Sequence, residues 1–125
     1  MAKVLIADDQ PNMRQLVRLT LETGQFEILE APDGDAALAL ARAERPDLLF
    51  LDWTMPGMAG VDVCRALRDD PDTADIRIVM LTARSQDSDR AQAQEMGADD
   101  YITKPFSPIQ LLEKVRDVLG PEALL

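Results

Sequence analysis

The sequence contains no histidine and only one cysteine among its 125 residues. Without histidine, the chain cannot carry a histidine catalytic triad, a histidine metal site or a phosphohistidine of its own. The lone Cys64 cannot form an internal disulfide, and no second cysteine is present to hold zinc with it. We expect Cys64 to be a small core residue, because it lies in the pattern VDVCRAL. A chain without disulfides fits a reducing cytoplasm.

Positive charge and long apolar runs are also scarce. The chain has 13 basic against 23 acidic residues, a net charge of −10. DNA and anionic membranes are bound through concentrated lysine and arginine, so we expect this chain to bind neither directly. No apolar run approaches the roughly 20 residues that a membrane span needs. The N-terminal segment reads MAKVLIADD, which has too few apolar residues for a signal peptide.

Short apolar runs alternate with longer segments of helical periodicity. Five runs are typical of strands: Lys3–Ala7, Phe26–Ala31, Leu48–Leu51, Ile78–Thr82 and Tyr101–Thr103. The segments that follow them are typical of helices: Met13–Leu21, Asp35–Glu44, Val61–Leu67, Ser85–Met96, and a fifth that Ser107 caps and that buries Ile109, Leu112, Val115 and Leu119. This alternation predicts an α/β fold in three layers, with a parallel sheet between helices.

Continuous apolar character places the first, third and fourth strands inside the sheet, and the other two at its edges. We expect one domain over residues 1–125, with residues 121–125 as a tail or the start of a linker. The fourth helical segment offers few apolar anchors, mainly Met96 and two alanines. It is either a weakly held element suited to switching or an ordinary exposed helix.

Polar residues follow the ends of the predicted strands. Asp8 and Asp9 follow the first strand, Asp52 follows the third, Thr82 ends the fourth and Lys104 follows the fifth. In an open α/β sheet, ligands bind beyond the carboxyl ends of the strands. Each of these residues taken singly has an ordinary structural explanation, but their placement at one edge indicates a site.

If the first and third strands are neighbours, the three acids Asp8, Asp9 and Asp52 share a small volume. Like charges this close either raise a pKa or bind a cation. Oxygen ligands without histidine or cysteine suit a hard ion, and a site with few carboxylates favours Mg²⁺, with Mn²⁺ as the alternative. A carboxylate beside Mg²⁺, the Lys104 ammonium and the Thr82 hydroxyl is equipped to accept a phosphoryl group as an acyl phosphate.

The sequence closely resembles the receiver domains of two-component response regulators. The motifs IADDQPNMR, APDGDAALALA, LDWTMPGMAGVD, VMLTARS and GADDYITKPF carry the resemblance over essentially the whole chain. It implies a CheY-like, flavodoxin-like doubly wound sheet of five parallel strands in the order 2-1-3-4-5. It also implies a switch rather than an enzyme. A sensor histidine kinase or a histidine phosphotransfer protein would donate the phosphoryl group. The surface of the fourth helix, fifth strand and fifth helix would then control a downstream protein or a dimer of the chain.

The resemblance implies roles for the acids. Asp52 would accept the phosphoryl group. Asp9, Asp52 and the backbone carbonyl of Thr54 would ligate Mg²⁺ directly, and Asp8 would act through water. The Lys104–Pro105 bond resembles the cis peptide of the family.

The other residues of the site also take their expected roles from the resemblance. Lys104 would pair with the phosphoryl oxygens, and Thr82 would move to hydrogen-bond one of them while the Tyr101 ring turns inward. Three backbone amides would line the same pocket, those of Trp53, Thr54 and Ala83. We expect Thr54 and Arg84, at positions where the family varies, to tune the lifetime of the phosphoryl group.

Two other functions stay open from the sequence. A phosphohydrolase of the haloacid dehalogenase type also uses an aspartyl phosphate, but it has a second acid where this chain has Thr54. A phosphorylation-independent interaction module usually lacks one of the acids, the threonine or the lysine, and this chain has them all. The sequence fits both a free-standing receiver and the front of a longer regulator.

Overall fold

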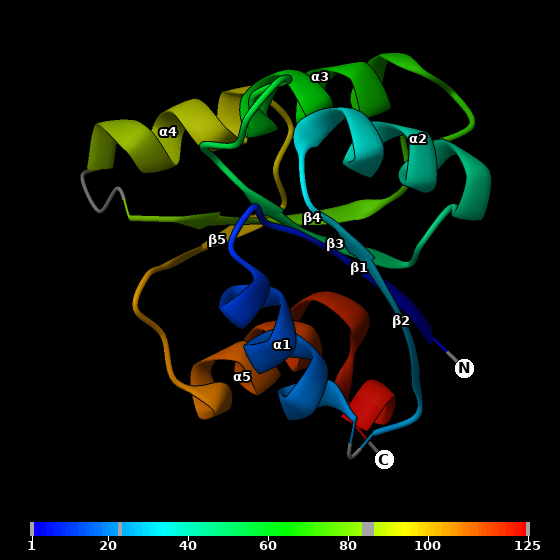
Figure 1. The fold of residues 1–125 in the computed structure, drawn as a ribbon, viewed down its shortest axis with the longest axis vertical. Coiled ribbons are helices and arrows are strands. Elements are labelled where there is room, and N and C mark those ends of the chain that lie inside the picture. Colours follow the sequence, from blue (N-terminus) through cyan, green and yellow to red (C-terminus); the bar gives the residue numbers. More distant parts are fainter. Residues whose placement is uncertain (1, 23, 84–86, 125) are drawn as a thin grey trace.

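Five parallel strands form one sheet in the order β2-β1-β3-β4-β5 (Figure 1). The computed structural model describes residues 2–22, 24–83 and 87–124. Its strands are β1 (Ala2–Ala7), β2 (Phe26–Ala31), β3 (Leu48–Asp52), β4 (Arg77–Thr82) and β5 (Asp100–Thr103). The predicted strand order is confirmed. The second and fifth strands, β2 and β5, lie at the edges of the sheet, as predicted.

Helices cover both faces of the sheet (Figure 1). One face carries α1 (Pro11–Leu21) and α5 (Pro108–Leu119), and the other carries α2 (Gly34–Glu44), α3 (Gly60–Asp69) and α4 (Asp87–Glu95). The residues expected to form a tail begin with a 3-10 helix, η1 (Pro121–Leu124). Within the described ranges, no helix has both the length and the apolar character needed to cross a bilayer.

Successive side chains of the sheet alternate between two cores, because strand residues point to opposite faces. The core under α2 and α3 receives, among others, Leu5, Leu49, Leu51, Ile78 and Met80. The core under α1 and α5 receives Val4, Ile6, Phe50, Val79 and Leu81. Cys64 is fully buried in the first core, as predicted. Burial raises the pKa of its thiol to about 11, so the residue is an inert core side chain.

Ser107 caps α5 as predicted, but one core residue predicted for this helix is exposed. Asp33 caps α2 by accepting a hydrogen bond from the amide of Ala36 at 2.8 Å. The prediction that Ile109 is buried is wrong, because its side chain is 67% exposed. Leu111 is fully buried instead, and residues two apart lie on opposite sides of a helix.

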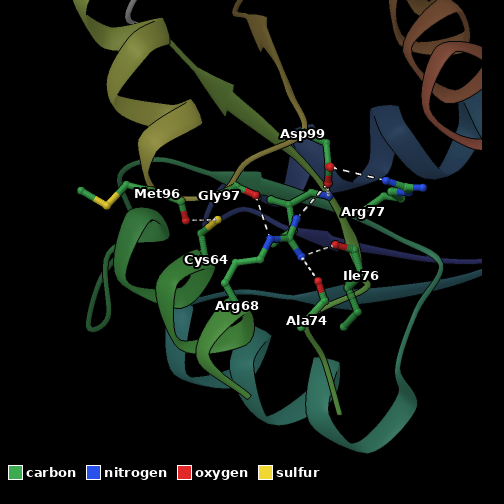
Figure 2. A network of polar contacts seen from close by, with 9 residues as sticks. Cys64, Arg68, Ala74, Ile76, Arg77, Met96, Gly97 and Asp99 are labelled. Carbon is green, nitrogen blue, oxygen red and sulfur yellow. Dashed lines mark hydrogen bonds and ion pairs between the residues drawn. The ribbon is translucent and has the colours of Figure 1, made fainter. Parts of the chain in front are cut away.

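Arg68 of α3 ties together the loops that frame β4 and β5 (Figure 2). Its guanidinium donates to three backbone carbonyls, those of Ala74, Ile76 and Gly97, and pairs with Asp99 at 2.9 Å. The Cys64 thiol donates to the carbonyl of Met96 at 3.2 Å. These contacts fasten the segment between α4 and β5 to α3.

The described side chains of α4 make little buried contact with the rest of the protein. Over residues 90–95, Ala93 alone is buried. The observed helix is shorter than predicted, because it ends at Glu95, and Ser85 lies outside the described residues. The scarcity of apolar anchors in the sequence therefore has its counterpart in an exposed helix. Its suitability for switching stays a prediction.

Gly60 allows α3 to approach the end of β3, which yields a test of the packing. Its amide donates to the Trp53 carbonyl at 3.0 Å, and a Cβ at this position would collide with the carbonyl of Asp52. We expect Gly60→Ala to lower the free energy of unfolding by about 1–3 kcal/mol, as overpacking does. Urea unfolding followed by circular dichroism measures it.

Helix propensity alone predicts the opposite sign, because alanine is the better helix former by about 1 kcal/mol. Ala66→Gly in the same helix is the control for this contribution. A Gly60→Ala variant more stable than the parent would contradict the close packing of α3 on the end of β3.

Candidate functional site

Neighbouring strands bring three acids together at one edge of the sheet. Asp8 directly follows β1, Asp52 ends β3, and these two strands pair with each other. Carboxylate oxygens of Asp8, Asp9 and Asp52 all lie within 4.8 Å of one another. The acids therefore share the small volume that the strand order predicts.

Asp8 is fully buried and has a partner for each carboxylate oxygen. Its Oδ1 accepts a hydrogen bond from the amide of Gln10 at 2.9 Å, and its Oδ2 accepts one from the Lys104 ammonium at 2.8 Å. Asp9 is exposed, and its carboxylate has no hydrogen bond or ion pair with other residues in the described part of the chain. The Asp9 oxygens are therefore available to a ligand.

Asp52 is nearly buried, with 6% of its surface exposed. Burial, followed by the negative charge of Asp8, raises the pKa of its carboxyl from 3.8 to about 6. The Lys104 ammonium, 3.6 Å from Oδ2, opposes the rise, as does the amide of Thr54, which donates to Oδ1 at 3.4 Å. The carboxylate is thus held in an environment that disfavours its charge.

The other two strand ends complete the site. Lys104 follows β5, and its ammonium lies against both Asp8 and Asp52. Thr82 is buried at the end of β4, and its carbonyl accepts a hydrogen bond from the amide of Lys104 at 2.7 Å. The Lys104–Pro105 peptide is cis, as the resemblance implies. One edge of the sheet therefore presents the acids, an ammonium and a threonine.

The loop after Asp52 differs in one respect from the expectation. The Trp53 amide donates to the Leu81 carbonyl at 3.0 Å, because the ladder between β3 and β4 continues one residue past the strand. It is therefore not a free donor for the pocket, whereas the Thr54 amide is directed at Asp52. Thr54 and Ala83 are exposed, and Arg84 lies outside the described residues.

Tyr101 lies on β5 and is already buried in this structure, with 6% of its surface exposed. Its ring packs beneath the guanidinium of Arg90, which is 5.0 Å from the ring centroid. Met80 is its neighbour on β4. The ring is thus covered in this structure, and its movement together with Thr82 stays a prediction.

Two contacts of the site went unpredicted from the sequence. Arg14 donates to the backbone carbonyl of Asp8 at 2.8 Å, and the Gln10 amide donates to the Asp8 carboxylate. The signal for Arg14 was its place in the motif DDQPNMR, in the first turns of α1 after the acidic pair.

These donors fit a hard divalent cation. They are all oxygens, and the only cation that ion-pairs with Asp8 and Asp52 in the described part of the chain is Lys104. Few carboxylates and one exposed side leave room for water, which suits Mg²⁺. The carboxylate oxygens of Asp9 accept no hydrogen bond in the described part of the chain, so a cation would not have to displace a donor from them.

The raised pKa of Asp52 predicts a stability change with a defined sign. The folded pKa of about 6 exceeds the unfolded value of 3.8, so ionising Asp52 above pH 6 costs the fold about 2–3 kcal/mol. We expect Asp52→Asn to be more stable than the parent by about this amount at pH 7.5 without divalent cations, with the difference lost as the pH falls from 6 to 4.

Urea unfolding at several pH values in the presence of a chelator measures the effect. Glu113→Gln, which removes an exposed acid on α5, is the control and is expected to follow the parent. An Asp52→Asn variant less stable than the parent at pH 7.5 would contradict the raised pKa.

Comparison with known proteins agrees with the fold. A family model for the response regulator receiver domain matches residues 4–116. The phosphate regulon transcriptional regulatory protein PhoB of Pseudomonas aeruginosa is 43% identical over 116 residues, which are 93% of this chain and 51% of that protein. The DNA-binding dual master transcriptional regulator RpaA of Synechocystis sp. is 44% identical over 119 residues, 95% of this chain and 49% of that protein. The chain thus spans about half the length of the curated relatives it matches.

Solved structures are similar over nearly the whole chain. The chemotaxis response regulator CheY4 of Vibrio cholerae superposes with a TM-score of 0.90 at 36% identity, covering 94% of this chain and 98% of that one. The BeF3-activated DrrB receiver domain gives a TM-score of 0.84 at 29% identity, covering 95% and 97%. Because the family model spans most of the chain and the fold follows solved receivers throughout, this chain belongs to the response regulator receiver domains of two-component systems.

Proposed function

We propose that the chain is a phosphorylation-activated switch in which Asp52 accepts the phosphoryl group. The observation that carries the proposal is the position of Asp52, nearly buried beside two acids and the Lys104 ammonium. A phosphohistidine of a sensor histidine kinase or of a histidine phosphotransfer protein is the donor, since this chain has no histidine. A carboxylate oxygen of Asp52 bonds to phosphorus as the phosphorus–nitrogen bond breaks, and the leaving imidazole takes the electron pair and then a proton.

Asp9, Asp52 and the carbonyl of Thr54 would hold Mg²⁺ directly, with Asp8 acting through water. The hydrogen bonds of Asp8 support this division. Gln10 and Lys104 already donate to its two carboxylate oxygens, whereas the carboxylate of Asp9 has no such partner in the described part of the chain. When bound, the cation neutralises charge that develops on the transferring phosphoryl oxygens. Mn²⁺, which accepts the same oxygen donors, is the alternative.

Lys104 and the amide of Thr54 stabilise the same charge from the protein side. The ammonium is 3.6 Å from Asp52 Oδ2, so a phosphoryl group on Asp52 would come within its reach. The Thr54 amide already faces the carboxylate. Thr82, at the end of β4, would donate its hydroxyl to a phosphoryl oxygen. Donors fixed in advance at developing charge act without reorganisation.

The output surface is the one formed by α4, β5 and α5. It adjoins the switch residues, because Thr82 ends β4 and Tyr101 lies on β5. A pocket of about 240 Å³ opens there, lined by residues from α4 to α5 that include Arg90, Ala93, Tyr101 and Lys114. Over residues 90–95, α4 buries only Ala93, so displacing this part of the helix would cost little. A shift from about 1:99 to 99:1 requires roughly 5.5 kcal/mol of differential stabilisation from the phosphoryl group.

A downstream protein or a second copy of the chain would read this surface. The names of PhoB and RpaA describe transcriptional regulators, so a DNA-binding effector is the output that the similarity favours. The receiver itself, with a net charge of −10, would act on that effector rather than on DNA.

Stepwise addition of Mg²⁺ and a phosphodonor tests the switch. Trp53, the only tryptophan, adjoins Asp52, so its fluorescence reports the site. We expect a saturable response to Mg²⁺ and then a second response to acetyl phosphate, together with the mass increase of one phosphoryl group. Asp52→Asn should lose the second response and the mass increase.

Asp62→Asn, which removes an exposed acid on α3, is the matched control and should be labelled like the parent. Labelling of Asp52→Asn to the level of the parent would place the phosphoryl group elsewhere. A parent that takes no label from acetyl phosphate or from a phosphorylated histidine kinase in Mg²⁺ would favour the phosphorylation-independent module.

Thr54 is expected to tune the lifetime of the phosphoryl group. Its side chain is exposed beside Asp52, on the side from which water reaches the acyl phosphate. We expect Thr54→Ala to uncover that side and to speed dephosphorylation several-fold, as measured by the decay of label after the donor is removed. Thr20→Ala, on α1, should decay like the parent. Equal decay of the parent and Thr54→Ala would contradict the role.

A further inference from the structure

The side chain of Arg14, on α1, contacts the backbone of the acidic site. Its Nη1 donates to the carbonyl of Asp8 at 2.8 Å, and its Nε pairs with Oε1 of Glu30 at 3.2 Å. The Arg14 side chain is 18% exposed, and both contacts are partly buried. The guanidinium therefore links the end of β1 to β2.

Glu30 is itself held in place. It pairs in register with Ile6 of β1, and its second oxygen accepts from Arg18 at 2.8 Å. Arg18 also donates to the carbonyl of Ile28, at 3.3 Å. Glu30, which holds the Arg14 guanidinium, is thus part of the sheet. Arg14 is therefore held in place where it contacts Asp8.

The contact with Asp8 constrains the orientation of Asp9. The carbonyl oxygen of Asp8 and the Cα of Asp9 belong to one planar peptide unit. An arginine that holds this oxygen holds the plane and the position of the Asp9 Cα, so it limits the directions from which the Asp9 side chain can approach the site. The carboxylate of Asp9 has no partner of its own in the described part of the chain, so its backbone is what aims it.

We propose that Arg14 is a positioning residue for the divalent cation site, acting through the Asp8–Asp9 peptide. This inference rests on the proposed function, since it presumes that Asp9 ligates the cation. Partners that orient the ligands of a metal are commonly worth about 10–100-fold in its affinity.

Charge and positioning make opposite predictions for the loss of Arg14. If the residue acted only as a charge, its removal would lower the positive potential near the acids and tighten cation binding. If it positions Asp9, its removal weakens binding. Arg18 shares the Glu30 anchor and the charge but contacts the carbonyl of Ile28 and not that of Asp8. The chain thus contains a matched control.

Titration calorimetry of Mg²⁺ into the full chain distinguishes these cases. We expect Arg14→Ala to weaken binding roughly tenfold. Arg14→Lys, which can reach either Glu30 or the Asp8 carbonyl but not both in the same way, should lie between Arg14→Ala and the parent. Arg18→Ala should bind as tightly as the parent or more tightly. Urea unfolding of the same variants shows whether the two alanine variants lose comparable stability.

If Arg14→Ala does not fold, Arg14→Lys and Glu30→Gln decide the question in its place, and unchanged affinity in both overturns the proposal.

The remaining outcomes separate the inference from the proposed function. A parent that binds Mg²⁺ while Arg14→Ala binds equally well or better overturns the positioning role and leaves the switch intact. Equal weakening in Arg14→Ala and Arg18→Ala also overturns it, because the loss would then reflect general packing of α1 on β2. A parent that binds no Mg²⁺ overturns both.

Discussion

Repulsion among three carboxylates at the edge of the sheet is the constraint on which the site depends. Their oxygens lie within 4.8 Å of one another, and the strands that hold Asp8 and Asp52 are buried on both faces. Asp8 and Asp52 cannot move apart without disturbing the pairing of β1 with β3, whereas the exposed Asp9 side chain can still rotate. Relief must therefore come from a proton, from the ammonium of Lys104 or from a bound cation. Burial contributes most to the raised pKa of Asp52, and the negative charge of Asp8 adds to it.

The same packing that creates the conflict connects it to the rest of the molecule. Gly60 brings α3 into contact with the end of β3 at Asp52 and Trp53, so α3 is packed directly against this strand end. At its other end, α3 holds the α4–β5 segment through Arg68 and Cys64 (Figure 2). α4 is therefore fastened at its C-terminal end and buries only Ala93 over residues 90–95. Such attachment is compatible with the switching role proposed for α4.

The sequence predicted the features that depend on local pattern. Continuous apolar runs identified the central strands, and the polar residues that ended them identified the acids, Thr82 and Lys104. Features that depend on exact contacts were missed. Ile109 satisfies helical spacing with Leu112 and Val115 as well as Leu111 does, and packing against the sheet decided that Leu111 and not Ile109 is buried. Likewise, only the pairing of β3 with β4 shows that the Trp53 amide is already used.

The charge balance of the site explains why a divalent cation suits it. Three carboxylates face one ammonium, so a cation of charge two brings the cluster to neutrality, whereas a monovalent ion leaves it negative. Lys104 lies closer to Asp8 than to Asp52, at 2.8 Å against 3.6 Å. In the proposed switch, a phosphoryl group on Asp52 would add negative charge within reach of the ammonium and would draw it from Asp8 toward Asp52. A cation bound beside Asp8 would replace the lost positive charge, so the cation and the phosphoryl group would stabilise each other through Lys104.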